Sequence, residues 1–144
     1  GYAKVSLFGL RDEPGTASAV FGAVDEAGVI VDMIIQNTAR HRITDLSFTI
    51  AIQDKGIVET TVRKLREQGI ISGFKIPVGF AKVSLIGIGM ISRRGVAAEA
   101  FAVLGHHSIN IESIVTSDIT ITVLVREDCA KRAVQVRAEH FHPG

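Results

Sequence analysis

A short sequence that occurs twice constrains the fold of this chain more than any other feature. Residues 3–10 read AKVSLFGL and residues 81–88 read AKVSLIGI, so the two copies differ only by exchanges between apolar residues. Because such self-similarity marks a duplicated structural unit, we expect two copies of one module. We place the first module at residues 1–80 and the second at residues 81–144.

The segment that follows this strand is also repeated. In each copy a polar loop ends in glycine, at Gly15 and at Gly95, and apolar residues then recur at helical spacing. The matching apolar positions are Ala17, Val20, Phe21 and Val24 in the first copy and Ala97, Ala100, Phe101 and Leu104 in the second. This spacing places the side chains on one face of an α-helix. Each module therefore begins with a strand, a loop and an amphipathic helix.

Apolar alternation and turn residues predict the order strand, helix, strand, strand, helix, strand for the first module. The expected elements are strands at 4–10, 29–36 and 44–52, a helix ending at Gly28, a helix at 54–69 capped by Asp54, and an edge strand or connector at 74–80. This order, with two helices on one face of an antiparallel sheet, is the α+β ferredoxin-like arrangement. The fold alone does not specify a function.

The second module repeats this order but ends before a fourth strand. Its expected elements are strands at 82–88, 109–116 and 118–125 and helices at 94–104 and 127–141. TDLSFT at 44–49 aligns with SDITIT at 117–122, which gives the first copy the longer preceding loop. The fourth strand is missing or supplied from elsewhere. Because an open sheet edge invites pairing, we expect a partner or another segment to cover it.

Composition excludes several classes of protein. The 144 residues carry 16 basic and 15 acidic side chains, well mixed, for a net charge of +1, so neither nucleic acid nor an anionic membrane is an expected partner. The single cysteine cannot form an intramolecular disulfide, and the apolar runs are too short to span a bilayer. We expect a cytoplasmic protein.

Motifs for catalysis are not found. The sequence contains no GxxxxGK[ST] loop, no nucleophile elbow and no Cys-x-x-Cys pair. We therefore expect no catalytic residues and no cofactor. The five histidines lack the spacing of a metal site, so no metal is expected. An acylphosphatase-like hydrolase on the same fold remains an alternative class, for which Arg93 or Arg94 could hold the phosphate.

The loop before the first helix of each module is a candidate ligand-binding site. The amides at a helix N-terminus lack intrahelical acceptors and lie at the positive end of the helix dipole, so they bind carboxylates. Asp12, in the first loop, could accept the ammonium group of an amino acid. Alternatively, Asp12, Pro14 and Gly15 serve only as capping and turn residues.

Taken together, these segments resemble a known family. The runs GLRDEPGTASAVFGAVDEAGVIVDMIIQN, TDLSFT, KVSLIGIGM, GVAAEAF and INIESIVTSDITITVLV resemble the paired ACT domains of the regulatory region of aspartate kinase. Similarity is greatest to the separate β subunits that some bacteria make of this region. It covers essentially the whole chain, and the patterns DxPG, DMIxQN and NIExIxTSDI occur in the family's order.

The resemblance implies a function. ACT domains bind amino acids, and this region mediates feedback inhibition by threonine, lysine or both in aspartate-family biosynthesis. The implied partners are a second copy of the chain, as a homodimer, and a catalytic subunit or kinase domain that phosphorylates the aspartate side chain with ATP. The chain would regulate without catalysing. The alternative is an ACT pair that senses amino acids for a different enzyme or for a transcription regulator.

Two effector pockets are expected, the first from the resemblance and the second from the internal duplication. The first, for threonine, uses Asp12, Gly15, Thr16, Ala17 and Gln36 of one copy together with Asn110 and Ile111 of the other. By internal duplication, a second pocket is expected at Asp32, Arg94, Gly95, Val96, Thr116, Ser117 and Asp118. Its two acidic residues, Asp32 and Asp118, favour a cationic side chain and hence lysine. The chain departs from the family at Arg94, where proline is usual, and at Ala39, where a small polar residue is usual. Arg94 could bind the ligand carboxylate or repel the lysine ammonium.

Overall fold

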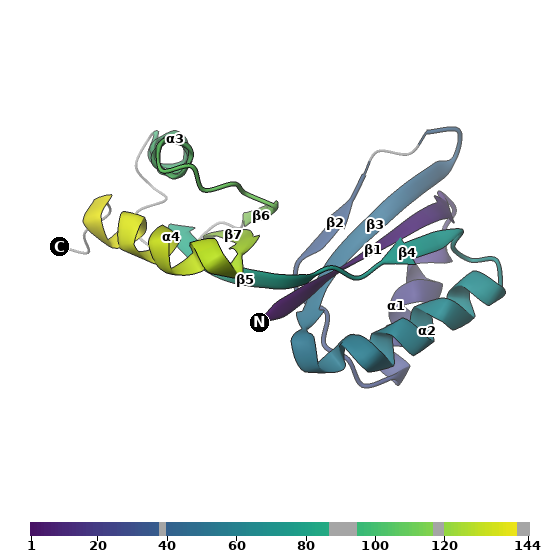
Figure 1. Ribbon diagram of the computed structural model, residues 1–144. Helices are drawn as coiled ribbons and strands as arrows, with labels where there is room; N and C mark the ends of the chain where they lie inside the picture. The colour runs from purple at the N-terminus through teal and green to yellow at the C-terminus, as the bar shows by residue number, and fades with distance from the viewer. Residues whose placement is uncertain (38–39, 87–94, 117–119, 141–144) are drawn as a thin grey trace. The chain divides into compact units, whose positions relative to one another are not determined.

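The computed structural model describes residues 1–37, 40–86, 95–116 and 120–140, and Figure 1 shows their helices and strands. The chain divides into two compact units, Gly1–Val78 and Gly79–Gly144. Each unit has a hydrophobic core of its own. We describe the units one at a time.

The first unit has the predicted ferredoxin-like order. Its elements are β1 (Tyr2–Arg11), α1 (Thr16–Glu26), β2 (Ile34–Gln36), β3 (Ile43–Ala51), the 3₁₀ turn η1 (Ile52–Asp54), α2 (Lys55–Glu67) and β4 (Gly73–Lys75). The strands pair antiparallel, with β3 between β2 and β1, and with β4 on β1. Helices α1 and α2 cover one face of this sheet (Figure 1). The predicted fold class is therefore confirmed.

Periodicity explains the core of the first unit. Side chains alternate across a strand, so Val5 and Leu7 of β1 both face inward and are fully buried. Helix α1 buries Val20 and Val24, which lie one turn apart, as the sequence pattern predicts. The Phe48 ring of β3 packs against Phe21 of α1, with 5.6 Å between the ring centroids. Helix α2 adds the buried residues Val58, Val62 and Leu65.

Strand β2 is shorter than the predicted strand at 29–36, because the chain is irregular before it. Thr49 faces two residues, accepting a hydrogen bond at its carbonyl from the Asp32 N–H (3.0 Å) and donating its N–H to the Met33 carbonyl (2.9 Å). Two residues opposite one is the arrangement of a β-bulge. The Met33 N–H donates to the buried Thr49 Oγ1 at 2.9 Å, which satisfies the amide left by the bulge.

The predicted side-chain caps are not made. Helix α1 begins after Gly15, which has a left-handed conformation, and Asp12 lies too far ahead to cap it. The Asp12 N–H instead donates to the Arg42 carbonyl at 2.7 Å, so the loop is attached to the residue that precedes β3. Asp54 occupies the residue before α2 but caps no amide with its side chain, because η1 leads directly into the helix.

The second unit contains β5 (Val78–Ile86), α3 (Val96–His106), β6 (Ser113–Thr116), β7 (Ile121–Arg126) and α4 (Glu127–His140). Strand β7 pairs antiparallel with both β5 and β6. Ala100 and Leu104 of α3 are buried in one core with Val123 and Val125 of β7 and Ala133 of α4. The described part of this unit holds three strands. In the described part of the whole chain, no helix is both long and apolar enough to cross a membrane.

The register of β7 corrects the predicted alignment of TDLSFT with SDITIT. Lys4 pairs with Thr49 in the first unit, and its repeat counterpart Lys82 pairs with Leu124 in the second. The structural counterpart of Thr49 is therefore Leu124, not Thr122. Side chains alternate with a period of two, so a two-residue shift leaves every residue on the same face and the pattern cannot detect it.

Candidate functional site

The loop between β1 and α1 presents unpaired amides. Gly15 has a φ of 95°, a left-handed conformation that glycine adopts readily, and it turns the chain into the helix. The first intrahelical hydrogen bond runs from the Ala19 N–H to the Gly15 carbonyl at 2.9 Å. The preceding amides of Ala17 and Ser18 have no intrahelical acceptor. These amides and the helix dipole favour an anionic group at this point.

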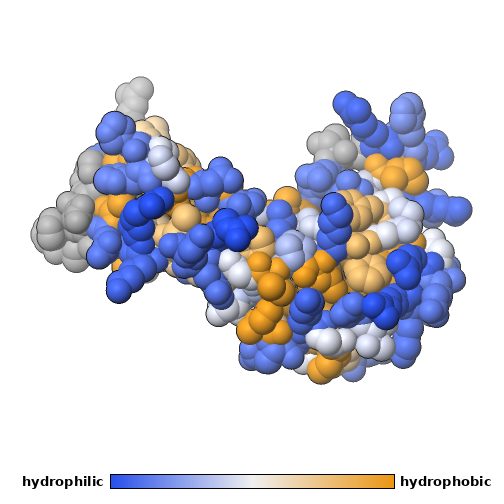
Figure 2. Space-filling model, in the orientation of Figure 1, coloured by the Kyte–Doolittle hydropathy of each residue, from blue (hydrophilic) through white to orange (hydrophobic). Residues whose placement is uncertain are grey.

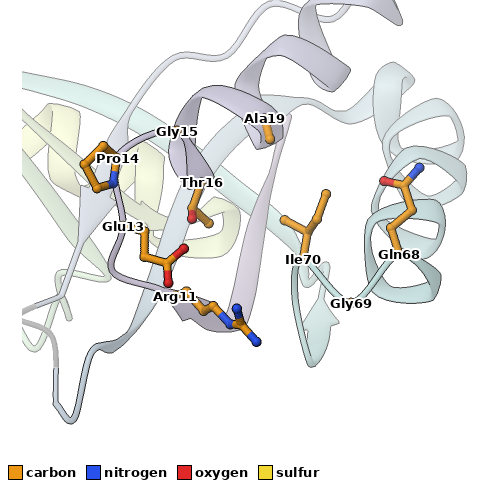
Figure 3. A pocket seen from close by; sticks show the side chains of 9 residues that line it. All are labelled: Arg11, Glu13, Pro14, Gly15, Thr16, Ala19, Gln68, Gly69 and Ile70. Atoms are coloured by element: carbon orange, nitrogen blue, oxygen red, sulfur yellow. The ribbon is translucent and has the colours of Figure 1, made fainter.

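A cavity of about 530 Å³ lies beside this helix start, wholly within the first unit. Its lining comes from two places, the β1–α1 loop with the start of α1 and the turn that follows α2 (Figure 3). The lining residues are Arg11, Glu13, Pro14, Gly15, Thr16, Ala19, Gln68, Gly69 and Ile70. Of the predicted site residues, Gly15 and Thr16 line this cavity, whereas Asp12, Ala17 and Gln36 do not.

The cavity has side chains of both charges. Arg11 and Glu13 are exposed, and Figure 3 shows both beside the half-buried Thr16. An arginine binds carboxylates bidentately, and a glutamate accepts from an ammonium group. The Thr16 hydroxyl and the Gln68 amide can each donate and accept hydrogen bonds. The arrangement is therefore complementary to a small zwitterion.

Sequence reasoning missed Arg11, Glu13 and the residues 68–70. The fold could have indicated the last group, since α2 runs opposite to α1 on the same face of the sheet and so ends near the start of α1 (Figure 1). Gly69 has a φ of 76° and ends α2 with a tight turn, as glycine at this position usually does. The acidic side chain at the cavity is Glu13, whereas the sequence pointed to Asp12.

Gln36, which was predicted for the threonine pocket from outside the β1–α1 loop, is exposed at the end of β2. Its neighbour Asn37 donates its N–H to the Asp45 carbonyl at 3.1 Å. Because the Arg42 carbonyl also holds Asp12, the start of β3 contacts both the β1–α1 loop and the end of β2. Two segments that the predicted threonine pocket requires are thus joined at one end of the sheet.

The predicted residues of the second unit lie at corresponding points. Gly95 has a φ of 82°, and Val96 begins α3, as Gly15 and Thr16 begin α1. Asn110 is exposed between α3 and β6, and its Nδ2 lies 3.5 Å from Glu112 Oε1. Ile111 is half-buried, and Thr116 ends β6 and is exposed.

Of the remaining residues singled out from the sequence, one lies within the described residues and four lie outside them. Asp32 is exposed at the bulge before β2. Ala39, Arg94, Ser117 and Asp118 lie outside the described residues. Within the described residues, no three histidine, cysteine, aspartate or glutamate side chains gather closely enough to hold a metal ion.

Comparisons with known proteins agree with the duplicated fold. Family models described as ACT domain match residues 5–69 and residues 83–141. The chain is 38% identical over 144 residues to the aspartokinase of Corynebacterium glutamicum, covering 99% of this chain and 34% of that protein. It is 36% identical to the aspartate kinase of Pseudomonas putida, of which it covers 32%. The chain thus spans about one third of the length of these curated relatives.

Two solved structures of regulatory subunits match over nearly their whole length. A chain in the crystal structure of aspartokinase alpha and beta subunits is 35% identical, with a TM-score of 0.87, covering 97% of this chain and 92% of that chain. The ligand-free regulatory subunit of aspartate kinase from Thermus thermophilus is 30% identical, again with a TM-score of 0.87, and 93% of it is covered. This chain belongs to the family of aspartate kinase regulatory regions built from two ACT domains.

Proposed function

We propose that this chain binds amino acids and thereby controls the activity of an aspartate kinase. The observation that carries the proposal is the cavity at the start of α1, which is lined by Arg11, by Glu13 and by the first residues of the helix, Gly15 and Thr16. A carboxylate on the amides and Arg11, with an ammonium on Glu13, would hold the two charges that every free amino acid carries. Membership of the family supplies the kinase as the controlled enzyme.

The proposed effectors are threonine at the first copy and lysine at the second. A threonine hydroxyl suits side chains that both donate and accept, such as Thr16 and Gln36. Asn110 of the other copy is proposed to complete that pocket. Asp32 and Asp118 would favour a cationic side chain near Gly95, with Arg94 on the ligand carboxylate. A kinase subunit is the proposed partner, in a cytoplasmic protein.

We also propose a homodimer in which the first copy of one chain pairs with the second copy of its partner. Strands β2 and β6 end the sheets of their units, each pairing there with one described strand, and each exposes isoleucine, with Ile34 51% and Ile114 44% exposed. Figure 2 shows apolar side chains interrupting a mainly hydrophilic surface. Sedimentation at micromolar concentration should give twice the chain mass of 15.4 kDa. A monomer at that concentration would rule out this dimer.

Calorimetric titration of the chain tests the effector assignment. Threonine and lysine should each bind saturably, whereas methionine and the branched-chain amino acids should not. Asn110→Ala should weaken threonine binding by about 1–3 kcal/mol, because it removes a hydrogen bond that would be buried in the proposed complex. Selective binding of methionine or a branched-chain amino acid would instead indicate an ACT pair that serves a different enzyme or a transcription regulator. No binding of any amino acid would overturn the proposal.

A further inference from the structure

The start of β3 contacts both chain segments that the proposed threonine pocket needs. These segments are the β1–α1 loop, which contains Asp12 and Gly15, and the end of β2 at Gln36. They are distant in sequence and not paired with each other, whereas β3 lies between β1 and β2 in the sheet (Figure 1). Whatever fixes the start of β3 to both neighbours therefore fixes the two segments relative to each other.

The contact toward β1 is made at a bulge. Leu7 pairs with Leu46 and Leu10 with Thr44, so two residues of β1, Phe8 and Gly9, face the single residue Asp45. Gly9 has a φ of 70°, and its N–H points out of the regular ladder. The Asp45 carboxylate accepts this N–H at Oδ1 over 3.2 Å. A carboxylate makes a stronger acceptor here than a neutral group, because the hydrogen bond is charge-assisted.

The contact toward β2 uses the backbone of the same residue. The Asp45 carbonyl accepts the N–H of Asn37, the residue after Gln36, at 3.1 Å. The hydroxyl of the preceding Thr44, which is 4% exposed, donates to the Asn37 carbonyl at 2.6 Å. Asn37 is therefore held at both its N–H and its carbonyl, and its position follows that of Asp45.

We propose that Asp45 is a positioning residue of the first effector pocket. Its carboxylate attaches the β1 bulge and its backbone attaches the end of β2, so it sets the spacing of the two segments without touching the ligand. The inference rests on the proposed function, which supplies the ligand. Removing the carboxylate frees the Gly9 amide and lets the β1–α1 loop shift against Gln36. Ligand contacts that need both segments at once then weaken.

The first test is calorimetric titration of the whole chain with threonine. Asp45→Ala should weaken binding tenfold or more, as expected for the loss of one charge-assisted hydrogen bond. Asp45→Asn keeps an oxygen acceptor of the same shape and should restore affinity to within about threefold of the parent. Ser6→Ala is the matched control, because it removes the 3.2 Å Ser6–Ser47 hydroxyl hydrogen bond from the same strand pair away from the loop. It should leave the threonine affinity unchanged.

The second test does not depend on any ligand. Amide hydrogen exchange of Gly9, and of Asp12 in the loop, should be faster in Asp45→Ala than in the parent, while amides in the middle of β1 keep their protection. If Asp45→Ala binds threonine as tightly as the parent, or if Ser6→Ala weakens binding equally, the positioning role is wrong. If the parent binds no threonine, the proposed effector fails, and the exchange data decide alone. Unchanged exchange at both amides would then overturn the role of Asp45, and faster exchange at both would support it.

Discussion

The two units begin their first helices in the same way. Helices α1 and α3 each have 11 residues and each follow a glycine in the left-handed conformation, Gly15 with a φ of 95° and Gly95 with a φ of 82°. In both, the residue four positions later donates its N–H to the carbonyl of that glycine. The distance is 2.9 Å from Ala19 to Gly15 and 3.0 Å from Glu99 to Gly95. The helix start that presents free amides is therefore present twice.

The same helices end with different residues in the same conformation. The left-handed residue after the helix is Gly28 in the first unit, with a φ of 79°, and Ser108 in the second, with a φ of 57°. Each donates its N–H three residues back, and the next residue donates five residues back, over 2.9 and 3.3 Å in the first unit and 3.0 and 2.9 Å in the second. This is a Schellman motif. The hydrogen bonds thus fix the backbone, even where the side chain disfavours it.

The sheets differ in how they fill the core. Val5 faces Phe48 in the first unit, and its counterpart Val83 faces Val123 in the second. The next position along is Thr49 in the first unit and Leu124 in the second, and both are buried. The duplicated strand is thus nearly unchanged while its partner strand has been replaced. Substitutions at these matched positions can show which side chains stabilise both units and which stabilise only one.

The largest expected effect comes from Phe48, an aromatic residue at a position where the second unit has Val123. Phe48→Ala should destabilise the first unit by about 3–5 kcal/mol, because it removes a buried ring and leaves a cavity. Val123→Ala, at the matched position, should cost about 2 kcal/mol, because fewer buried carbons are lost. Urea denaturation of both variants measures the difference. Equal losses would show that the two cores depend on this position to the same extent.

Substitution of Gly9, at the β1 bulge, should destabilise the first unit nearly as much. Gly9→Ala requires a left-handed alanine, at about 1–2 kcal/mol. A Cβ at Gly9 would also lie 2.8 Å from Ser72 Cβ, an overlap that costs about a further 1–3 kcal/mol. Gly28→Ala is the control, since its Cβ would have no atom within 4 Å. In thermal denaturation, Gly9→Ala combined with Ser72→Gly should recover only the overlap part. Full recovery would mean that the left-handed conformation carries no cost there.

The sequence predicted the parts of this fold that depend on periodicity. Val20 and Val24, and equally Ala100 and Leu104, are buried because one helix face meets the sheet, and the pattern shows that face directly. The bulges were not predicted. The one before β2 exists because Thr49 satisfies two residues at once, a property of the strand pair that neither strand's own pattern contains.

The candidate site was predicted where its residues are local in sequence. Gly15 and Thr16 follow from the loop before a helix, and both line the cavity. Gln68, Gly69 and Ile70 were missed because they meet the loop only through the packing of α2 on the same sheet face. Arg11 was missed because a single charge at a strand end is typical of any solvated turn.

Buried hydroxyl groups give a third, smaller contrast. Thr49→Val should cost about 1–3 kcal/mol, because the Met33 N–H loses its buried acceptor. Ser113 of β6, which pairs with Leu124, has a buried hydroxyl that makes no hydrogen bond in the described part of the chain. Ser113→Ala should therefore leave stability unchanged or raise it by up to about 1 kcal/mol. Denaturation of the two variants in parallel tests the contrast, and a clear loss in Ser113→Ala would show that its hydroxyl has a partner.

The smallest expected effect concerns the two helix ends. A left-handed residue other than glycine costs about 1–2 kcal/mol, whereas glycine loses about 0.5–1 kcal/mol more in conformational entropy on folding. Ser108→Gly should therefore stabilise the second unit by about 0.5–1 kcal/mol, and Gly28→Ser should destabilise the first by a similar amount. The Ser108 carbonyl accepts a hydrogen bond from Arg132 of α4 at 3.3 Å, a contact that the glycine keeps. Because that contact involves only the backbone of residue 108, any difference between the two substitutions reports the local conformation. If both variants destabilise the protein, the Ser108 side chain contributes a stabilising interaction that outweighs its strain, and the two helix ends are not equivalent.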